Sequence, residues 1–286
     1  MLKAAHSALT ILRSRGGALD AVVAAVRTLE DDPLFNAGRG SALNALGAVE
    51  MDAAVMVAGS AAIPGSNDAG GVAIVSRVRN PILLARAVME KSPHVLIAGA
   101  GAERFARQAG MTLCRPEEMV TARSRARWTA IVKRAENRAS EHGTVGAVAL
   151  DLNGGIAAAT STGGITGKLP GRIGDSPIPG AGLFAGAVGA ASATGYGEAI
   201  ITHALCRDAV EGLIVATPQK SARQSILQMA RATSRDAGVI LIDAQGRVGY
   251  AHNAAAMEVV SFDRRAGLVH RWVEPIGRTR QGSGSA

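Results

Sequence analysis

The sequence has 286 residues, of which 48% are hydrophobic, 3% are aromatic and 35 are glycines, and its formal net charge is +8. This length is enough to bury a substantial core, and no apolar run approaches the ~20 residues of a membrane-spanning helix. The N-terminal residues from Met1 to His6 lack a signal-peptide core, so we expect a cytoplasmic protein with no membrane partner.

The positive charge raises the question of nucleic-acid binding. Apart from clusters in 115–140 and in the tail, the basic residues are spread along the chain, and only Trp128 accompanies the first cluster. We find no zinc-finger spacing and no RNP-like aromatic pair, so we predict a solvated basic linker over 115–142 and no nucleic-acid partner. Cys114 and Cys206 form no CxxC pair, and no metal site built from side chains is indicated.

The first half of the chain alternates helical and strand patterns. Apolar residues at helical spacing over 19–29 predict a helix that ends before Pro33. A loop rich in small residues follows over 34–41. Further helices are expected at 82–89, 102–109 and 123–139, and strands at 53–58, 70–76 and 95–98. Gly99 to Gly101 could cradle a phosphate, but Arg104 stands where a dinucleotide fingerprint needs its third glycine, so we favour an ordinary turn.

The second half opens with apolar runs at 144–152 and 156–160, joined by an Asn-Gly turn that predicts a hairpin. The segments that follow are a long loop at 168–177, strands at 188–194, 238–242 and 247–251, helices at 198–206 and 220–233, and a disordered tail at 277–286. We interpret Glu198 as an acidic residue in the first turn of a helix, where the helix dipole favours a negative charge. Antiparallel hairpins with helices grouped before and after them predict an α+β fold with two helix-covered sheets.

Thr144 stands where the basic linker, ending in His142 and Gly143, meets the strand that starts the second half. A threonine hydroxyl is a poor nucleophile unless a base takes its proton. A chain-terminal threonine carries its own base, because an α-amino group has a pKa of about 7.7–8.0, near the pH at which general bases work best. We therefore predict that the Gly143–Thr144 bond is cut and that Thr144 then attacks an amide.

Several polar residues could complete such a site. Thr162 lies on the return strand of the hairpin and could orient the nucleophile. Thr194 and Gly195, at a strand end, offer a hydroxyl and an N–H to an oxyanion. Arg172 and Asp175 share one loop, where an arginine suits an α-carboxylate and an aspartate suits an α-ammonium.

Each of these residues also has a structural interpretation. A threonine at a strand start is a good β-former, and Thr162 and Thr194 could be turn hydroxyls. Arg172 and Asp175 could pair with each other across their loop. Asn36 could bond its own backbone. The residues argue for a site only in combination.

The combination resembles a known family. The segments 34–40, 50–53, 80–81, 143–151, 159–164 and 170–177 closely resemble motifs of the plant-type L-asparaginase / isoaspartyl peptidase family of N-terminal-nucleophile (Ntn) hydrolases, and the similarity covers roughly 17–260. Gly163 favours this branch, since the related glycosylasparaginases tend to have asparagine there.

The resemblance implies a four-layer αββα sandwich of mainly antiparallel sheets, forming one folded domain. It also implies autocatalytic cleavage into an α-subunit part, 1–143, and a β-subunit part, 144–286, that assemble as an (αβ)₂ heterotetramer. The implied activity is hydrolysis of the β-amide of L-asparagine and of β-aspartyl dipeptides. No cofactor is required, although the loop from Leu29 to Gly38 resembles the family's sodium-binding loop, whose ligands are mainly backbone carbonyls.

The resemblance also implies roles for the site residues. Thr144 would be the nucleophile with Thr162 assisting it, and Thr194 and Gly195 would form the oxyanion hole. The substrate would be held by two residues, Arg172 and Asp175, while Asn36 would support the site from the α-subunit part.

The chain departs from the family pattern in two places. The family begins with a strand that leads into a glycine-rich loop near the nucleophile, and nothing here matches it, so we expect truncation at the N-terminus and an exposed sheet edge. Ala254 stands where threonine is usual. The alternatives to the implied activity are an uncleaved, weakly active or inactive homologue and a glycosylasparaginase-like enzyme.

Overall fold

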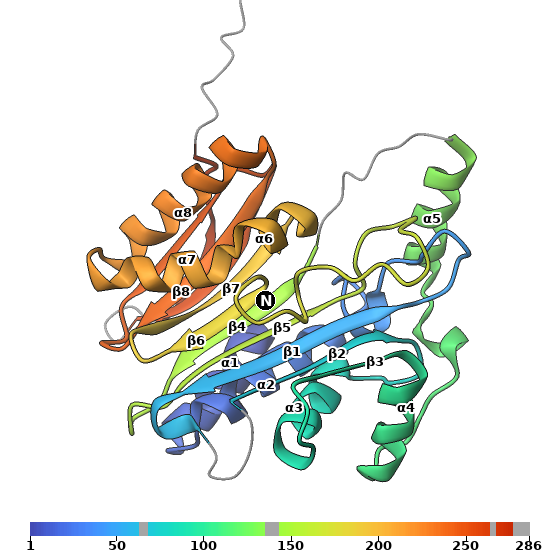
Figure 1. Ribbon diagram of the computed structural model, residues 1–286, viewed down its shortest axis with the longest axis horizontal. Coiled ribbons are helices and arrows are strands. Elements are labelled where there is room, and N and C mark those ends of the chain that lie inside the picture. Colours follow the sequence, from blue (N-terminus) through green and yellow to red (C-terminus); the bar gives the residue numbers. More distant parts are fainter. Residues whose placement is uncertain (63–67, 135–142, 264–266, 277–286) are drawn as a thin grey trace, which may run out of the picture.

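Two β-sheets pack face to face between two layers of helices in the computed structural model, which describes residues 1–62, 68–134, 143–263 and 267–276 (Figure 1). This arrangement confirms the predicted α+β, αββα architecture. The expected tail at 277–286 and the linker residues 135–142 lie outside the described residues.

The larger sheet combines strands from both halves of the chain. Its order is β3-β2-β1-β5-β4, and its strands are β1 (Met51–Ala58), β2 (Ala69–Val75), β3 (Leu96–Ala98), β4 (Val145–Leu150) and β5 (Ile156–Thr162). All neighbours are antiparallel except β2 and β3. Because β1 pairs with β5 along its length, the two sequence halves are joined by backbone hydrogen bonds.

The smaller sheet is antiparallel throughout. It runs β6 (Leu183–Gly186), β7 (Gly189–Gly195), β8 (Ala237–Asp243) and β9 (Val248–His252), and a separate hairpin joins β10 (Glu258–Asp263) to β11 (Gly267–Trp272). The sequence analysis did not predict β6 or this hairpin. Strand β6 is only four residues long, Leu-Phe-Ala-Gly, and shows no polar alternation.

Helices cover the outer face of each sheet. The larger sheet is covered by α1 (Leu2–Arg13), α2 (Ala18–Glu30), α3 (Pro81–Lys91) and α4 (Gly99–Gln108), and the smaller by α6 (Gly197–His203), α7 (Leu205–Glu211) and α8 (Pro218–Thr233) (Figure 1). Helix α5 (Ala122–Arg134) belongs to the basic segment. Short 3₁₀ turns lie at Gly38–Gly40, Gly59–Ala61, Pro116–Met119 and Gly212–Ile214. No helix in the described ranges combines the length and the hydropathy needed to span a bilayer.

The predicted helix at 123–139 corresponds to α5 as far as Arg134, and its remaining residues lie outside the described ones. Two other predictions differ more from the structure. The helix expected at 198–206 is two helices, because Ala204 adopts a left-handed conformation (φ 51°, ψ 49°) that a continuous helix cannot contain. Helix α4 begins at Gly99, so the predicted Gly99–Gly101 turn is its first turn.

The side chains of β1 alternate between two cores. Ala53, Val55 and Val57 face the helices, whereas Ala54 and Met56 face the second sheet. The layer between the sheets is thin, because its fully buried members are mostly alanines: Ala54, Ala158, Ala185 and Ala190, with Ile156 and Leu183.

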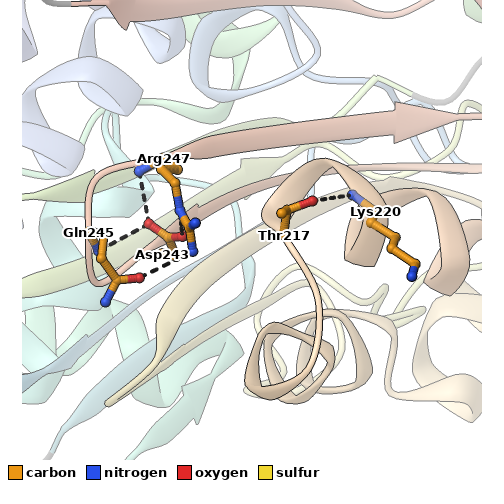
Figure 2. Close-up of polar contacts among 5 residues, drawn as sticks. All are labelled: Thr217, Lys220, Asp243, Gln245 and Arg247. Carbon is orange, nitrogen blue, oxygen red and sulfur yellow. Dashed lines mark hydrogen bonds and ion pairs between the residues drawn. The ribbon is translucent and has the colours of Figure 1, made fainter.

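Local polar contacts fix the smaller sheet at its far edge. Figure 2 shows Asp243 in the β8–β9 turn, where its Oδ1 accepts hydrogen bonds from the N–H groups of Gln245 (3.0 Å) and Arg247 (2.8 Å). Asp243 Oδ2 also lies 2.6 Å from Arg247 Nε. Thr217 caps α8 by accepting a hydrogen bond from Lys220 N–H. The opposite end of β8 pairs with Gly195, one of the predicted site residues.

Candidate active site

Thr144 lies immediately before β4, at the point where the two sheets meet. Its backbone N–H donates a hydrogen bond of 3.3 Å to the hydroxyl of Thr194 near the end of β7. The predicted nucleophile and a predicted oxyanion donor are therefore in contact, although they come from different sheets.

A small cavity of about 10 Å³ collects most of the predicted site residues. Its lining comprises Gly143, Thr144, Thr162, Gly164, Ile165, Arg172, Asp175 and Gly195. This volume holds about one water molecule. Gly143, the residue directly ahead of Thr144, is part of the wall and therefore occupies space at the site.

Thr162 ends β5 and is buried. Its hydroxyl accepts a hydrogen bond of 3.0 Å from Gly164 N–H. This contact matches the structural interpretation of Thr162 as a turn hydroxyl. Among the described residues it forms no hydrogen bond to Thr144, but it lines the same cavity.

Asn36 connects three segments around the site. Its Oδ1 accepts a hydrogen bond from Ala42 N–H (2.7 Å), its Nδ2 donates to Gly164 O (2.7 Å), and its carbonyl accepts from Gly163 N–H (3.0 Å). A Cβ on Gly163 would lie 2.6 Å from Asn36 Oδ1 and 2.5 Å from Ala42 N. The loop therefore excludes the larger residue that glycosylasparaginases tend to have at this position.

Arg172 pairs with Glu198 and not with Asp175, which corrects one structural interpretation of the loop. Arg172 Nε donates to Glu198 Oε1 at 2.9 Å. Arg172 Nη2 is buried and lies 2.9 Å from the same oxygen, which completes the ion pair, but it forms no hydrogen bond in the described part of the chain. Asp175 is buried, and its Oδ2 also lacks a hydrogen-bond partner there.

Burial dominates the electrostatics of Asp175. Desolvation raises the pKa of its carboxyl to about 7, with Arg172 opposing the shift and Asp52 and Glu198 adding to it. The carboxyl thus gains its charge near neutral pH, where it could bind an ammonium group.

Two buried charges that the sequence analysis did not select support this loop. Burial raises the pKa of Asp52 on β1, and Lys168 opposes that shift. Asp52 accepts hydrogen bonds from Ile74 N–H (2.9 Å) and Gly174 N–H (3.3 Å), so it holds the loop next to Asp175. Lys168, whose pKa burial lowers, donates to Glu50 O at 2.7 Å. The sequence feature that could have indicated this role is Asp52, a charged residue directly before the apolar run 53–58.

Glu30, the last residue of α2, is a third buried charged residue that sequence reasoning missed. Its Oε1 accepts hydrogen bonds from Ser161 Oγ (2.6 Å) and Ile82 N–H (3.0 Å). Desolvation raises its pKa to about 8. Glu30 therefore ties α2 to the residue that precedes Thr162.

Glycines at 195 and 197 allow close backbone approaches beside the cavity. Gly195 has φ +140°, and a Cβ there would lie 2.6 Å from Asp236 O. A Cβ on Gly197 would lie 2.7 Å from Arg172 Nη2 and 2.9 Å from Asp175 Oδ1. Neither position has room for a side chain.

The four-layer fold, with a threonine immediately before the edge strand β4 and its cavity at the junction of the sheets, is that of an Ntn-hydrolase. The model of the asparaginase family matches residues 1–266. The chain therefore belongs to that family.

Named relatives agree with this assignment. The isoaspartyl peptidase/L-asparaginase of Bos taurus is 42% identical over 255 residues, which are 86% of this chain and 80% of the relative. The protein of the same name from Danio rerio is 40% identical over 250 residues, 85% and 79% of the two chains. The plant-type L-asparaginase of Pyrococcus abyssi is 40% identical over 262 residues, 85% and 82% of the two chains.

Proposed function

We propose that this protein hydrolyses the β-amide of L-asparagine and the β-aspartyl bond of isoaspartyl dipeptides through a threonyl acyl-enzyme. The observation that carries the proposal is a pair of buried, oppositely charged side chains: Asp175, whose Oδ2 has no hydrogen-bond partner among the described residues, and Arg172, whose buried Nη2 contacts Glu198 as an ion pair but forms no hydrogen bond there. Both residues line the cavity that Thr144 lines. The names of the related proteins, isoaspartyl peptidase/L-asparaginase and plant-type L-asparaginase, support the same substrates.

The two groups match the amino-acid end of these substrates. The guanidinium would bind the α-carboxylate, and the Asp175 carboxylate would bind the α-ammonium. A buried polar atom without a hydrogen bond is costly, so a substrate that supplies hydrogen bonds to Arg172 Nη2 and Asp175 Oδ2 is favoured over one that supplies neither. Held by its α-substituents, the substrate would present its β-carbonyl to Thr144.

The catalytic threonine would be released by the chain itself. Thr144 Oγ would attack the carbonyl carbon of Gly143, forming an ester as the Thr144 nitrogen leaves and takes up a proton. Water would then hydrolyse the ester, leaving a carboxylate on Gly143 and a free amine on Thr144. Because Gly143 lines the cavity, its departure would also open space for the substrate.

In turnover, the free amine of Thr144 would take the hydroxyl proton as Oγ attacks the β-carbonyl. Gly195 N–H and the Thr194 hydroxyl would stabilise the oxyanion. The C–N bond would then break, the leaving ammonia or amino acid taking the proton, and water would hydrolyse the aspartyl ester. Thr162, in the cavity wall, would keep the nucleophile aligned.

We also propose a structural Na⁺ on the loop from Leu29 to Gly38. The carbonyls of Glu30, Pro33 and Phe35 crowd against the backbone of Gly38 and Gly40, where a Cβ would clash with them. Within the described ranges none of the three accepts a backbone hydrogen bond. Uncharged oxygens of this kind suit a hard cation, whose positive charge would fix the loop that carries Asn36.

Two cleaved chains would assemble as an (αβ)₂ heterotetramer. The fragments of one chain would stay together after cleavage, because β1 from the first fragment pairs with β5 from the second from Asp52 to Ala58.

Intact mass and substrate assays test the proposal together. The expected result is two fragments divided at Thr144, with ammonia released from L-asparagine and amino acid released from isoaspartyl dipeptides. An uncleaved chain that releases neither product would support the inactive-homologue alternative. Preferential cleavage of glycosylated asparagine would support the other alternative, which the crowding around Gly163 disfavours.

Asn36→Ala should lower kcat for asparagine at least about tenfold, because the Gly164 carbonyl and the Ala42 N–H both lose a buried partner, at about 1–3 kcal/mol each. Asn44→Ala is the matched control, since Asn44 Oδ1 accepts from Leu46 and Ala48 N–H in a different turn. Thermal midpoints and steady-state rates should show both variants destabilised but only Asn36→Ala slowed. Equal rates in the two variants would remove Asn36 from the site.

A further inference from the structure

Lys168 is a buried lysine behind the candidate site, and the proposed reaction does not use it. Of the lysines whose side chains the structure describes, only this one is buried, with 6% of its surface exposed. Its Nζ donates a hydrogen bond of 2.7 Å to Glu50 O. Burying an ammonium group is costly unless other groups compensate its charge, so the surroundings of Lys168 determine whether it stays charged.

Two acidic side chains favour the charged form of Lys168. Burial lowers its pKa, and the charges of Asp52 and Glu50 oppose that shift, while the charge of Arg172 adds to it. Glu50 is itself held in place, because its carboxylate accepts hydrogen bonds of 3.1 and 3.2 Å from Gly171 N–H. The loop thus encloses an ammonium group between fixed partners.

Only the backbone of Gly164 separates this ammonium group from the cavity that Thr144 lines. Gly164 is part of the cavity wall. A Cβ on Gly164 would lie 2.8 Å from Lys168 Nζ, so the ammonium group lies against this glycine. The cavity is only about 10 Å³, the size of one water molecule, and Thr144 lines it together with Gly164. The charge of Lys168 therefore acts on Thr144 through buried protein, where salt screens weakly.

The other charged groups at the cavity have a different task. The charged side chains of its lining are Arg172 and Asp175. In the proposed function, both are paired with the α-substituents of the substrate. Lys168 does not line the cavity, and its Nζ already donates to Glu50 O. Its positive charge is therefore not paired with substrate and remains to act on Thr144.

We propose that Lys168 is a positioning residue whose buried positive charge keeps the α-amine of cleaved Thr144 in the neutral form that accepts a proton. A nearby positive charge disfavours a second one, so the amine loses its proton at a lower pH than it would without Lys168. The neutral amine is the form that can take the hydroxyl proton of Thr144. This inference rests on the proposed function, since the amine exists only after cleavage before Thr144.

The pH dependence of kcat for the cleaved protein tests this role. At saturating L-asparagine, kcat reports on groups of the enzyme–substrate complex, in which Asp175 is already paired with the substrate. The acid limb of the profile should then follow the Thr144 amine. Lys168→Gln removes the charge but can still donate to Glu50 O, and it should move the acid limb to higher pH by about one unit. Lys168→Met should move the limb in the same direction, so either neutral variant is sufficient.

Two further variants separate charge from structure. Lys168→Arg keeps a positive charge, and its acid limb should coincide with that of the parent. Lys220→Met is the matched control, because Lys220 is an exposed lysine in the first turn of α8 (Figure 2). It should change neither kcat nor the acid limb.

The proposal is overturned if the neutral variants lower kcat without moving the acid limb, which is the result expected of a merely structural residue. It is also overturned if Lys168→Arg moves the limb as far as they do. Ammonia release by the parent chain reports separately on the proposed function, because it does not depend on any comparison with the Lys168 variants.

Discussion

Replacing Thr144 with alanine should leave the chain in one piece and reduce asparagine hydrolysis by at least about 1,000-fold, as expected when a covalent nucleophile is removed. Alanine keeps the backbone and the start of β4 but has no oxygen to attack Gly143 or a substrate. Intact mass and ammonia release report the two losses independently.

Two variants control this result. Thr144→Ser retains a hydroxyl and should still be cleaved, at a reduced rate. Thr202→Ala makes the same substitution on α6, where, within the described part of the chain, the hydroxyl donates only to the carbonyls of Glu198 and Ala199. It should behave as the parent chain. Two fragments from Thr144→Ala, or an unchanged rate, would contradict the assignment of the nucleophile.

Replacing Asp175 with asparagine should lower kcat/KM for asparagine about 100-fold while leaving cleavage of the chain intact. The loss corresponds to about 3 kcal/mol, within the range for removing one partner of a buried charge pair. The chain's own Gly143–Thr144 bond presents no α-ammonium, so maturation should not need the Asp175 carboxylate.

The pH dependence has a definite sign. Burial raises the pKa of Asp175 from 3.8 to about 7, so its substrate-binding charge appears only as the pH rises through about 7. The kcat/KM of the parent should rise over that interval, and the part due to Asp175 should vanish in Asp175→Asn. Conversely, this residue's contribution to folding stability is fully present below about pH 4 and is lost as the pH rises through about 7.

Asp243→Asn is the matched control, because Asp243 is also buried but lies in the β8–β9 turn (Figure 2). It should lower the thermal midpoint without changing KM or the pH profile. Equal loss of kcat/KM in both variants would indicate a general loss of stability and not substrate recognition.

The elements with strong local patterns were predictable from the sequence. The helical spacing over 19–29 gave α2, and the Asn-Gly turn gave the β4–β5 hairpin. The break at Ala204 was not predictable, because alanine favours continued helix and nothing in the local sequence signals its left-handed conformation.

Within the candidate site, motif resemblance selected residues that the fold brings to one cavity, including Thr144, Arg172 and Asp175. The supporting contacts were missed because they join distant positions and leave no local pattern. Glu30 bonds Ser161 across 131 positions, and Asp52 reaches Gly174 across 122. The contact of Glu198 with Arg172 was also missed, because the position of Glu198 in the first turn of a helix already explained an acidic residue there.

The alanines buried between the two sheets help to set the distance between the sheets. Thr144 directly precedes a strand of one sheet and Gly195 ends a strand of the other, so the distance between the proposed nucleophile and the proposed oxyanion donor depends on how closely the sheets approach. Alanine has no side-chain rotamers, so Ala54, Ala158, Ala185 and Ala190 leave fewer adjustable side chains in this layer than larger residues would, beside Ile156 and Leu183. A bulkier residue in this layer would push the sheets apart and so misalign Thr144 and Gly195 without contacting either residue. The alignment of Thr144 with its proposed oxyanion donor would thus depend on alanines that take no part in the reaction.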